Sequence, residues 1–173
     1  MIFFYLSHLH FLAFLTISLT INSCKKDDKA EGIDKELLDM ARSTNGFVWY
    51  KKSSALLNKS SGTGHSFPYL RTRYNSTAAT KLDSNGIILP GVTFPEGSLI
   101  VKELYSNSST LSRYAILYKK SGRAETDAKG WIWGYVNADG TVASPASEKG
   151  NSCINCHSQT GSIDYMLMNK YFP

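Results

Sequence analysis

The stretch Leu99-Ile100-Val101-Lys102-Glu103-Leu104-Tyr105 decides how this chain folds. It is rich in apolar and β-branched residues, which favour a pleated strand. Side chains alternate between the two faces of a strand, so Lys102 shares a face with Ile100 and Leu104. The pattern favours an edge strand, where the lysine stem covers apolar surface and its ammonium reaches water. The alternative is a pocket that holds Lys102 for a purpose.

Similar segments on either side complete a β-rich domain. Strands are predicted, from their content of Val, Ile, Tyr and Trp, at residues 47–50, 69–74, 98–105, 113–118 and 131–136. Asn and Gly mark tight turns at 83–86 and 137–140. Ile33, Leu37 and Ala41 recur every four residues and predict a helix over 34–42. We therefore expect an α+β fold, a predominantly antiparallel sheet of about five strands with a few flanking helices.

Composition narrows the class of protein. The chain has 173 residues, of which 42% are hydrophobic, so it can build the core of one ordinary domain and is not a disordered polymer. Its formal net charge is +5, but the basic residues are spread along the chain rather than gathered in a stripe. We therefore expect no nucleic-acid partner.

The N-terminal segment predicts export. Residues 1–23 contain no Lys, Arg, Asp or Glu, and their apolar run leads into Leu19-Thr20-Ile21-Asn22-Ser23-Cys24, which is typical of a lipoprotein signal. We expect cleavage before Cys24, a lipid on that cysteine and a flexible tether over 24–32, followed by a compact domain over 33–173. The protein would then lie in the periplasm or on the cell surface, tethered to a membrane. The alternative is an uncleaved anchor with an idle thiol.

The strongest chemical motif is Cys153-Ile154-Asn155-Cys156-His157 near the C-terminus. Two thiols three residues apart, followed directly by histidine, are typical of covalent haem c attachment. The thiols would add to the vinyl groups, and His157 would bind the iron. We predict one haem c per chain, attached at the C-terminal end. A redox pair or half of a zinc site are the alternatives, but zinc would need two further ligands.

The sixth coordination position of the iron separates an electron carrier from a gas binder or an enzyme. Met166 and Met168 follow His157 closely and are predicted to pack beside the porphyrin or in the core, with methionine ligation as the alternative. His65, in the loop Gly62-Thr63-Gly64-His65-Ser66, is interpreted as a solvated histidine, with distal ligation as the alternative.

A wider resemblance joins these features. The segment Phe94-Pro95-Glu96-Gly97-Ser98-Leu99-Ile100-Val101-Lys102-Glu103-Leu104, followed by aromatic strands and the C-x-x-C-H motif, resembles the cytochrome P460 family. These are exported mono-haem proteins with a mostly β fold, usually dimeric, that oxidise hydroxylamine. The resemblance implies a covalent bond from Lys102 to the haem, and an arginine near the haem in the strand 68–74, at Arg71. It makes Lys102 and Arg71 the candidate catalytic residues, and implies a homodimer and an electron-acceptor protein.

One departure from that family bears on the activity. Members that oxidise hydroxylamine place a carboxylate on the strand after the lysine strand, whereas the matching segment here is Tyr114-Ala115-Ile116-Leu117-Tyr118. We expect instead an open distal position under Ile116, Leu117 and Tyr118. Oxidation of a small nitrogen substrate is therefore weighed against binding of nitric oxide or carbon monoxide, as in the related cytochrome c-prime-beta, and against electron transfer.

Overall fold

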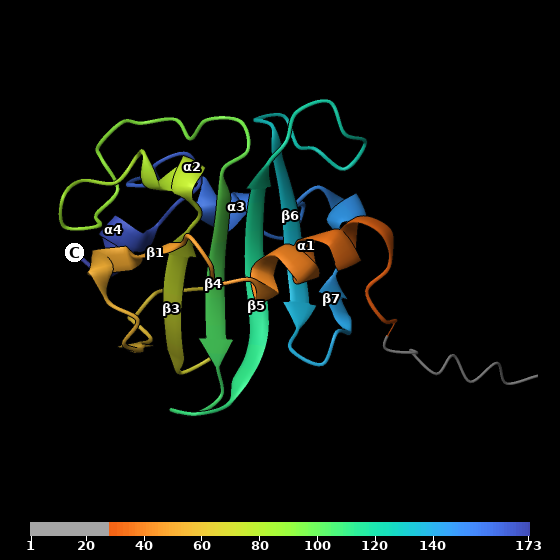
Figure 1. Ribbon diagram of the computed structural model, residues 1–173, viewed down its shortest axis with the longest axis horizontal. Helices are drawn as coiled ribbons and strands as arrows, with labels where there is room; N and C mark the ends of the chain where they lie inside the picture. The colour runs from red at the N-terminus through yellow and green to blue at the C-terminus, as the bar shows by residue number, and fades with distance from the viewer. Residues whose placement is uncertain (1–27) are drawn as a thin grey trace, which may run out of the picture.

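Seven strands form one antiparallel sheet, in the computed structural model, which describes residues 28–173. The order is β1-β3-β4-β5-β6-β7, and β2 also pairs with β3 (Figure 1). The strands are β1 (Val48–Trp49), β2 (Leu57–Asn58), β3 (Tyr69–Tyr74), β4 (Leu99–Tyr105), β5 (Leu111–Lys119), β6 (Trp131–Asn137) and β7 (Val142–Ser144). The α+β prediction is confirmed, and the five expected strands are all present. The very short β2 and β7 were not expected.

Helices cover both faces of the sheet. Helix α1 (Gly32–Arg42) lies across one face over β5 and β6, while α2 (Ser76–Ala79), α3 (Ile154–His157) and α4 (Met168–Tyr171) lie behind the sheet (Figure 1). Two 3-10 turns, η1 (Tyr50–Lys52) and η2 (Ala146–Glu148), complete the secondary structure. The predicted helix over 34–42 is confirmed and begins two residues earlier. The C-terminal segment therefore lies opposite α1, with the sheet between them.

The alternation in β4 divides the core into two clusters. Leu99 and Val101 pack with α1, whereas Ile100 and Leu104 pack on the opposite face. Strand β4 pairs with β3 on one side and β5 on the other, so it is a central strand. The prediction that Lys102 lies on an edge is therefore wrong, because strand order depends on pairing between distant segments, which the alternation of one strand does not encode.

Strand β6 follows the same alternation. Ile132 and Val136 face α1, and Trp131 and Trp133 pack on the opposite face, with Tyr135 against them. These three aromatic residues therefore pack in the core. Trp133 and Tyr135 in addition form part of a cavity wall.

The segment before α1 is attached to the sheet where it is described. The backbone N–H of Ala30 donates to the Gly140 carbonyl at 2.8 Å, and that of Val142 donates to the Asp28 carbonyl at 2.9 Å. Residues 28–30 of the expected tether thus pair with the β6–β7 turn. The signal sequence and Cys24 lie outside the described residues. Within 28–173, no helix has the length and apolar character needed to span a membrane.

Candidate functional site

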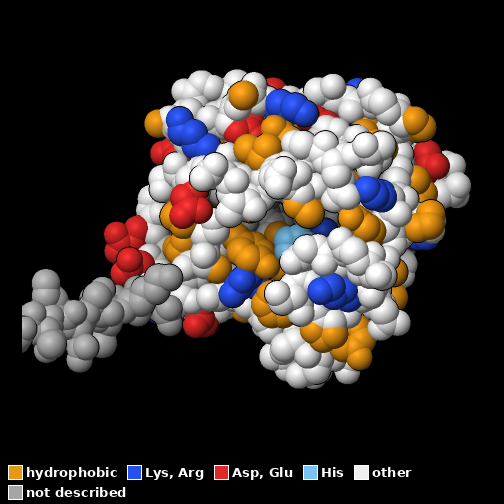
Figure 2. Space-filling model, turned by 180° about the vertical axis from the view of Figure 1, so that it is seen from behind, with side chains coloured by type: hydrophobic (Ala, Val, Ile, Leu, Met, Phe, Trp, Pro, Cys, Tyr) orange, Lys and Arg blue, Asp and Glu red, His pale blue; other side chains and the backbone are white. Residues whose placement is uncertain are grey.

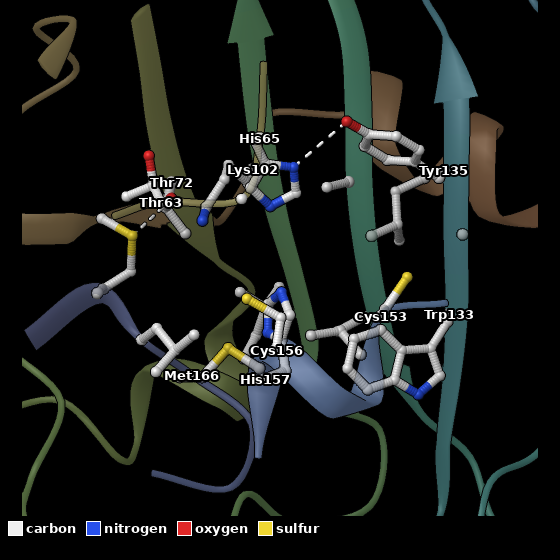
Figure 3. Close-up of a pocket in the computed structure, with 18 of the residues that line it drawn as sticks. Thr63, His65, Thr72, Lys102, Trp133, Tyr135, Cys153, Cys156, His157 and Met166 are labelled. Carbon is white, nitrogen blue, oxygen red and sulfur yellow. Dashed lines mark hydrogen bonds between the residues drawn. The ribbon is translucent and has the colours of Figure 1, made fainter. Parts of the chain in front are cut away.

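A cavity of about 270 Å³ lies between the sheet and the C-terminal segment, on the face opposite α1. Figure 2 shows a histidine side chain within a hollow surrounded by hydrophobic side chains. The sheet lines this cavity with side chains that include Ile100, Lys102, Leu117, Trp133 and Tyr135, and α3 lines it with Cys153, Cys156 and His157 (Figure 3). The structure therefore brings the C-x-x-C-H motif and Lys102, about fifty residues apart in sequence, to one site.

A tight turn places the motif in the cavity wall. Gly150 has a φ of +71°, and its carbonyl accepts hydrogen bonds from the backbone N–H groups of Cys153 and Ile154, both at 2.8 Å. The N–H of His157 donates to the Cys153 carbonyl at 3.0 Å, closing the single turn of α3. Left-handed backbone favours glycine, because a side chain there meets the following carbonyl.

Gly150→Ala is expected to destabilise this turn. A Cβ built on Gly150 would lie 2.6 Å from the Trp133 ring, in addition to the strain of its positive φ. We expect a loss of about 2–4 kcal/mol in the free energy of unfolding, measured by urea denaturation. Gly122→Ala is the matched control, because Gly122 has a similar φ of +78° and no atom within 4 Å of the added Cβ. Equal losses in the two variants would contradict the packing argument.

The His157 side chain is oriented by a backbone carbonyl. Its Nδ1 lies 2.7 Å from the Tyr165 carbonyl oxygen, and its ring meets Trp133 edge to face with centroids 5.3 Å apart. That carbonyl is held because Asp164, the preceding residue, accepts a hydrogen bond from Trp131 Nε1 at 3.1 Å. Burial, with a contribution from Lys102, lowers the pKa of His157 to about 4. The ring is therefore neutral at pH 7, with Nε2 left to bind a metal.

The two motif thiols are free and lack the features of a redox pair. Burial raises the pKa of the Cys153 thiol, whereas a reactive C-x-x-C pair depends on a lowered pKa. The sheet beside them is antiparallel, without the βαβ unit of a thioredoxin-like site. In residues 28–173, no group of three or more His, Cys, Asp or Glu side chains is arranged to hold a metal ion, so the zinc alternative gains no support.

Lys102 extends from the middle of β4 into the cavity (Figure 3). It pairs across the sheet with Thr72 in β3 and Ala115 in β5, and its side chain is half-buried. Desolvation lowers the pKa of its ammonium to about 8. The alternative of a lysine held in a pocket is therefore the one that the structure supports, and an appreciable fraction of this amine is uncharged in mildly alkaline solution.

Lys102→Met is expected to stabilise the haem-free protein at pH 7. Below pH 8 the lysine is charged in both the folded and the unfolded state, so folding includes the full cost of desolvating its ammonium. We expect removal of that cost to raise the free energy of unfolding by about 1–3 kcal/mol. The pKa is lower in the folded state, so wild-type stability rises as pH increases from about 8 to 10.5, and the advantage of Met shrinks there. Urea denaturation at pH 7 and 10 measures this difference. The exposed Lys120→Met is the control, and an equal change there would contradict the prediction.

Arg71 is not brought to the cavity. It pairs with Glu103 across the sheet, on the face opposite Lys102, and its Nε lies 2.6 Å from Glu103 Oε2. Arg73 lies on the same face, with Nε 3.0 Å from Glu103 Oε1 and further donors on the Ala41 and Ser43 carbonyls. The side chain that β3 contributes to the cavity wall is that of Thr72. Glu103 thus faces away from Lys102, as the alternation of side chains along β4 requires.

His65 lines the cavity, where its alternative role as a distal ligand would place it. It lies in the loop between β2 and β3 and is half-buried, and its Nδ1 is 3.3 Å from the Tyr135 hydroxyl. Burial and nearby positive charge, that of Lys102 above all, lower its pKa to about 2. The interpretation as a solvated loop histidine is therefore wrong. The glycines around His65 are loop signals, and spacing along the chain does not show which wall a loop will cover.

The remaining cavity wall is apolar. Met166 and Met168 are buried in the core beside it, as predicted. Leu117 faces the cavity, Ile116 borders it while packing in the cluster under α1, and Tyr118 packs against that cluster alone, so only part of the expected lid is on this face. Among the described residues, none of the side chains that line the cavity is an Asp or a Glu. The expected lack of a carboxylate base therefore holds for the whole described wall.

These residues fit a haem. Two free thiols and a neutral imidazole with an uncommitted Nε2 are the donors that the C-x-x-C-H motif contributes, and they open onto an apolar cavity. A hydrogen-bonded carbonyl behind the ligating histidine is a typical second-shell partner.

Comparison with known proteins supports the same conclusion. The family model described as Cytochrome P460 matches residues 49–168, which include the last residue of β1, all of β2 to β7 and the whole C-x-x-C-H motif. No curated protein and no solved structure matches the chain.

Proposed function

The chain belongs to the cytochrome P460 family and is therefore a haem protein, and on this premise we propose that it is an exported, lipid-anchored c-type cytochrome that oxidises hydroxylamine or a similar small nitrogen compound. One haem would be attached covalently to Cys153 and Cys156, with His157 bound to the iron. The single observation that supports this proposal is that these three residues and Lys102 line one apolar cavity.

Each of these side chains has a separate task. Bound haem supplies an iron that can bind a nitrogen ligand and change oxidation state. Cys153 and Cys156 hold the macrocycle in place, and the Tyr165 carbonyl orients His157. The apolar wall, with Ile100 and Leu117, excludes water. We further propose that Lys102 bonds to the haem, as in the family, since its amine lies in this cavity with a lowered pKa.

Binding of nitric oxide or carbon monoxide without turnover is the second candidate function. It is favoured by the lack of Asp and Glu in the described wall, because oxidation of hydroxylamine requires groups that accept the substrate's protons. His65 and Tyr135 are polar groups on this wall, but burial and the charge of Lys102 lower the pKa of His65 to about 2, so its imidazole is a weak base and does not replace the missing carboxylate.

Visible spectra and a turnover assay on the exported, matured protein distinguish the candidates. A bond from Lys102 to a meso carbon interrupts the conjugation of the ring and moves the main absorption band to the red, and Lys102→Met should remove this shift. Hydroxylamine-dependent reduction of an added acceptor supports the oxidase. An unshifted spectrum together with tight binding of nitric oxide and no turnover supports the gas binder. Colourless matured protein would contradict both.

Location and partners are part of the same proposal. We propose that a lipid on Cys24 anchors the protein to a membrane at the periplasm or cell surface, that an electron-acceptor protein receives the electrons released by oxidation, and that the chain forms a homodimer. Intact mass of the membrane fraction tests the lipid, because Cys24→Ser should remove its added mass. Light scattering of the soluble domain tests the dimer.

A further inference from the structure

Two histidine rings face each other across the cavity. The centroids of His65 and His157 are 6.2 Å apart, and the ring planes are inclined at 77°. Figure 3 shows His65 on the sheet side and His157 on the α3 side, with a gap between them. The two residues reach this gap from elements that are about ninety positions apart in the sequence, the β2–β3 loop and α3.

Each ring has its Nδ1 occupied and its Nε2 uncommitted. His157 Nδ1 lies 2.7 Å from the Tyr165 carbonyl oxygen, so it must be the donor there. His65 Nδ1 lies 3.3 Å from the Tyr135 hydroxyl, which can accept from it. Histidines that bind metals typically donate their second ring N–H to such an oxygen, which fixes the tautomer and aims the other nitrogen at the metal. His157 has this arrangement, and His65 has it in the tautomer that carries the proton on Nδ1.

The separation of the rings matches two axial ligands of one metal ion. An imidazole nitrogen binds a transition metal at about 2 Å. A five-membered ring with bonds of about 1.3 Å places that nitrogen about 1.1 Å from the centroid. Two imidazoles on opposite sides of one metal ion therefore have centroids about 6 Å apart, close to the observed 6.2 Å. A diatomic ligand inserted between the iron and His65 would require a larger separation.

We propose that His65 is the second axial ligand of the haem iron, opposite His157, in the resting protein. An external ligand must then displace His65 before it binds. The loop position suits this exchange, because His65 can leave without breaking a strand. The inference rests on the haem function proposed above. It replaces the open distal position expected from the sequence with a position that His65 occupies until an external ligand displaces it.

The test uses the exported, haem-loaded protein and His65→Ala. Electron paramagnetic resonance and visible absorption of the ferric wild type should show a low-spin, six-coordinate haem with two imidazole ligands. His65→Ala should become high-spin, and added imidazole should restore the low-spin spectrum. Binding of carbon monoxide to the reduced protein should be about tenfold faster or more in His65→Ala, because the competing ligand is gone. Ser66→Ala, next to His65 on the same loop but exposed and outside the cavity lining, is the control and should behave as wild type.

Two results would overturn the inference. One is a wild-type ferric haem that is high-spin and binds carbon monoxide as fast as His65→Ala does. The other is a low-spin spectrum that persists in His65→Ala but is lost in Lys102→Met, which would make the lysine the ligand. If His65→Ala does not take up haem, a high-spin ferric wild type is by itself enough to overturn the inference. His65→Gln is then the second variant, because glutamine is closer to histidine in volume. Matured wild type without haem would instead refute the proposed function, so the two failures are distinguishable.

Discussion

Replacing Cys153 and Cys156 together by serine is expected to abolish thioether attachment of haem. Cys153 precedes α3 and Cys156 lies within it; both line the cavity beside His157, and neither is in a disulfide. Serine preserves their size but cannot form a stable bond to a vinyl group. The test is best made in a Lys102→Met background, so that no lysine bond can hold the macrocycle in place of the cysteines.

Intact mass after denaturation measures this effect, because only covalently bound haem survives that treatment. The Lys102→Met protein should carry the mass of one haem, and the variant with both serines should carry none. Cys24→Ser in the same background is the control, since it removes the third cysteine of the chain and should leave the haem mass in place. Haem retained by the double-serine variant would show that it is attached through some other residue.

Glu103→Gln is expected to cause the largest loss of stability. Glu103 is 3% exposed and accepts from Arg71 Nε at 2.6 Å, Arg73 Nε at 3.0 Å and the Tyr105 hydroxyl at 2.8 Å. Glutamine has nearly the same shape but no charge, so the variant leaves Arg73, itself 1% exposed, without its counter-ion. Removing one partner of a buried ion pair costs about 3–5 kcal/mol.

Urea denaturation of wild type and variant at the same pH checks this value. Glu36→Gln is the matched control, because Glu36 lies 3.1 Å from Arg123 in a pair whose side chains are 43% and 39% exposed. An exposed pair is worth about 0–1 kcal/mol and weakens with salt, whereas the effect of Glu103→Gln should change little with salt. Losses within about 1 kcal/mol of each other would refute the importance assigned to the buried cluster.

The periodicity of apolar residues along the chain was sufficient to predict β4, which carries Lys102, and helix α1. The alternation of apolar residues predicted β4 and correctly placed Lys102 and Glu103 on opposite faces, because neighbouring side chains in a strand must point in opposite directions. The repeat of Ile33, Leu37 and Ala41 predicted α1 for the analogous reason in a helix. Strands β2 and β7 were missed because segments of two and three residues are too short to show a period.

Pairing between distant segments decided the rest. The pairing of β3 with β4 contributes to the central position of β4. The register of the same pair sets Arg71 beside Glu103, so Arg71 is not directed into the cavity. The sequence by itself identified the residues that can bond to a haem. In a C-x-x-C-H motif the two thiols can add to vinyl groups and the adjacent imidazole can bind iron, whatever the surrounding fold. Only the tertiary structure set His65 opposite His157, because a loop and a helix about ninety residues apart in sequence meet on one face of the sheet only after its strands have paired.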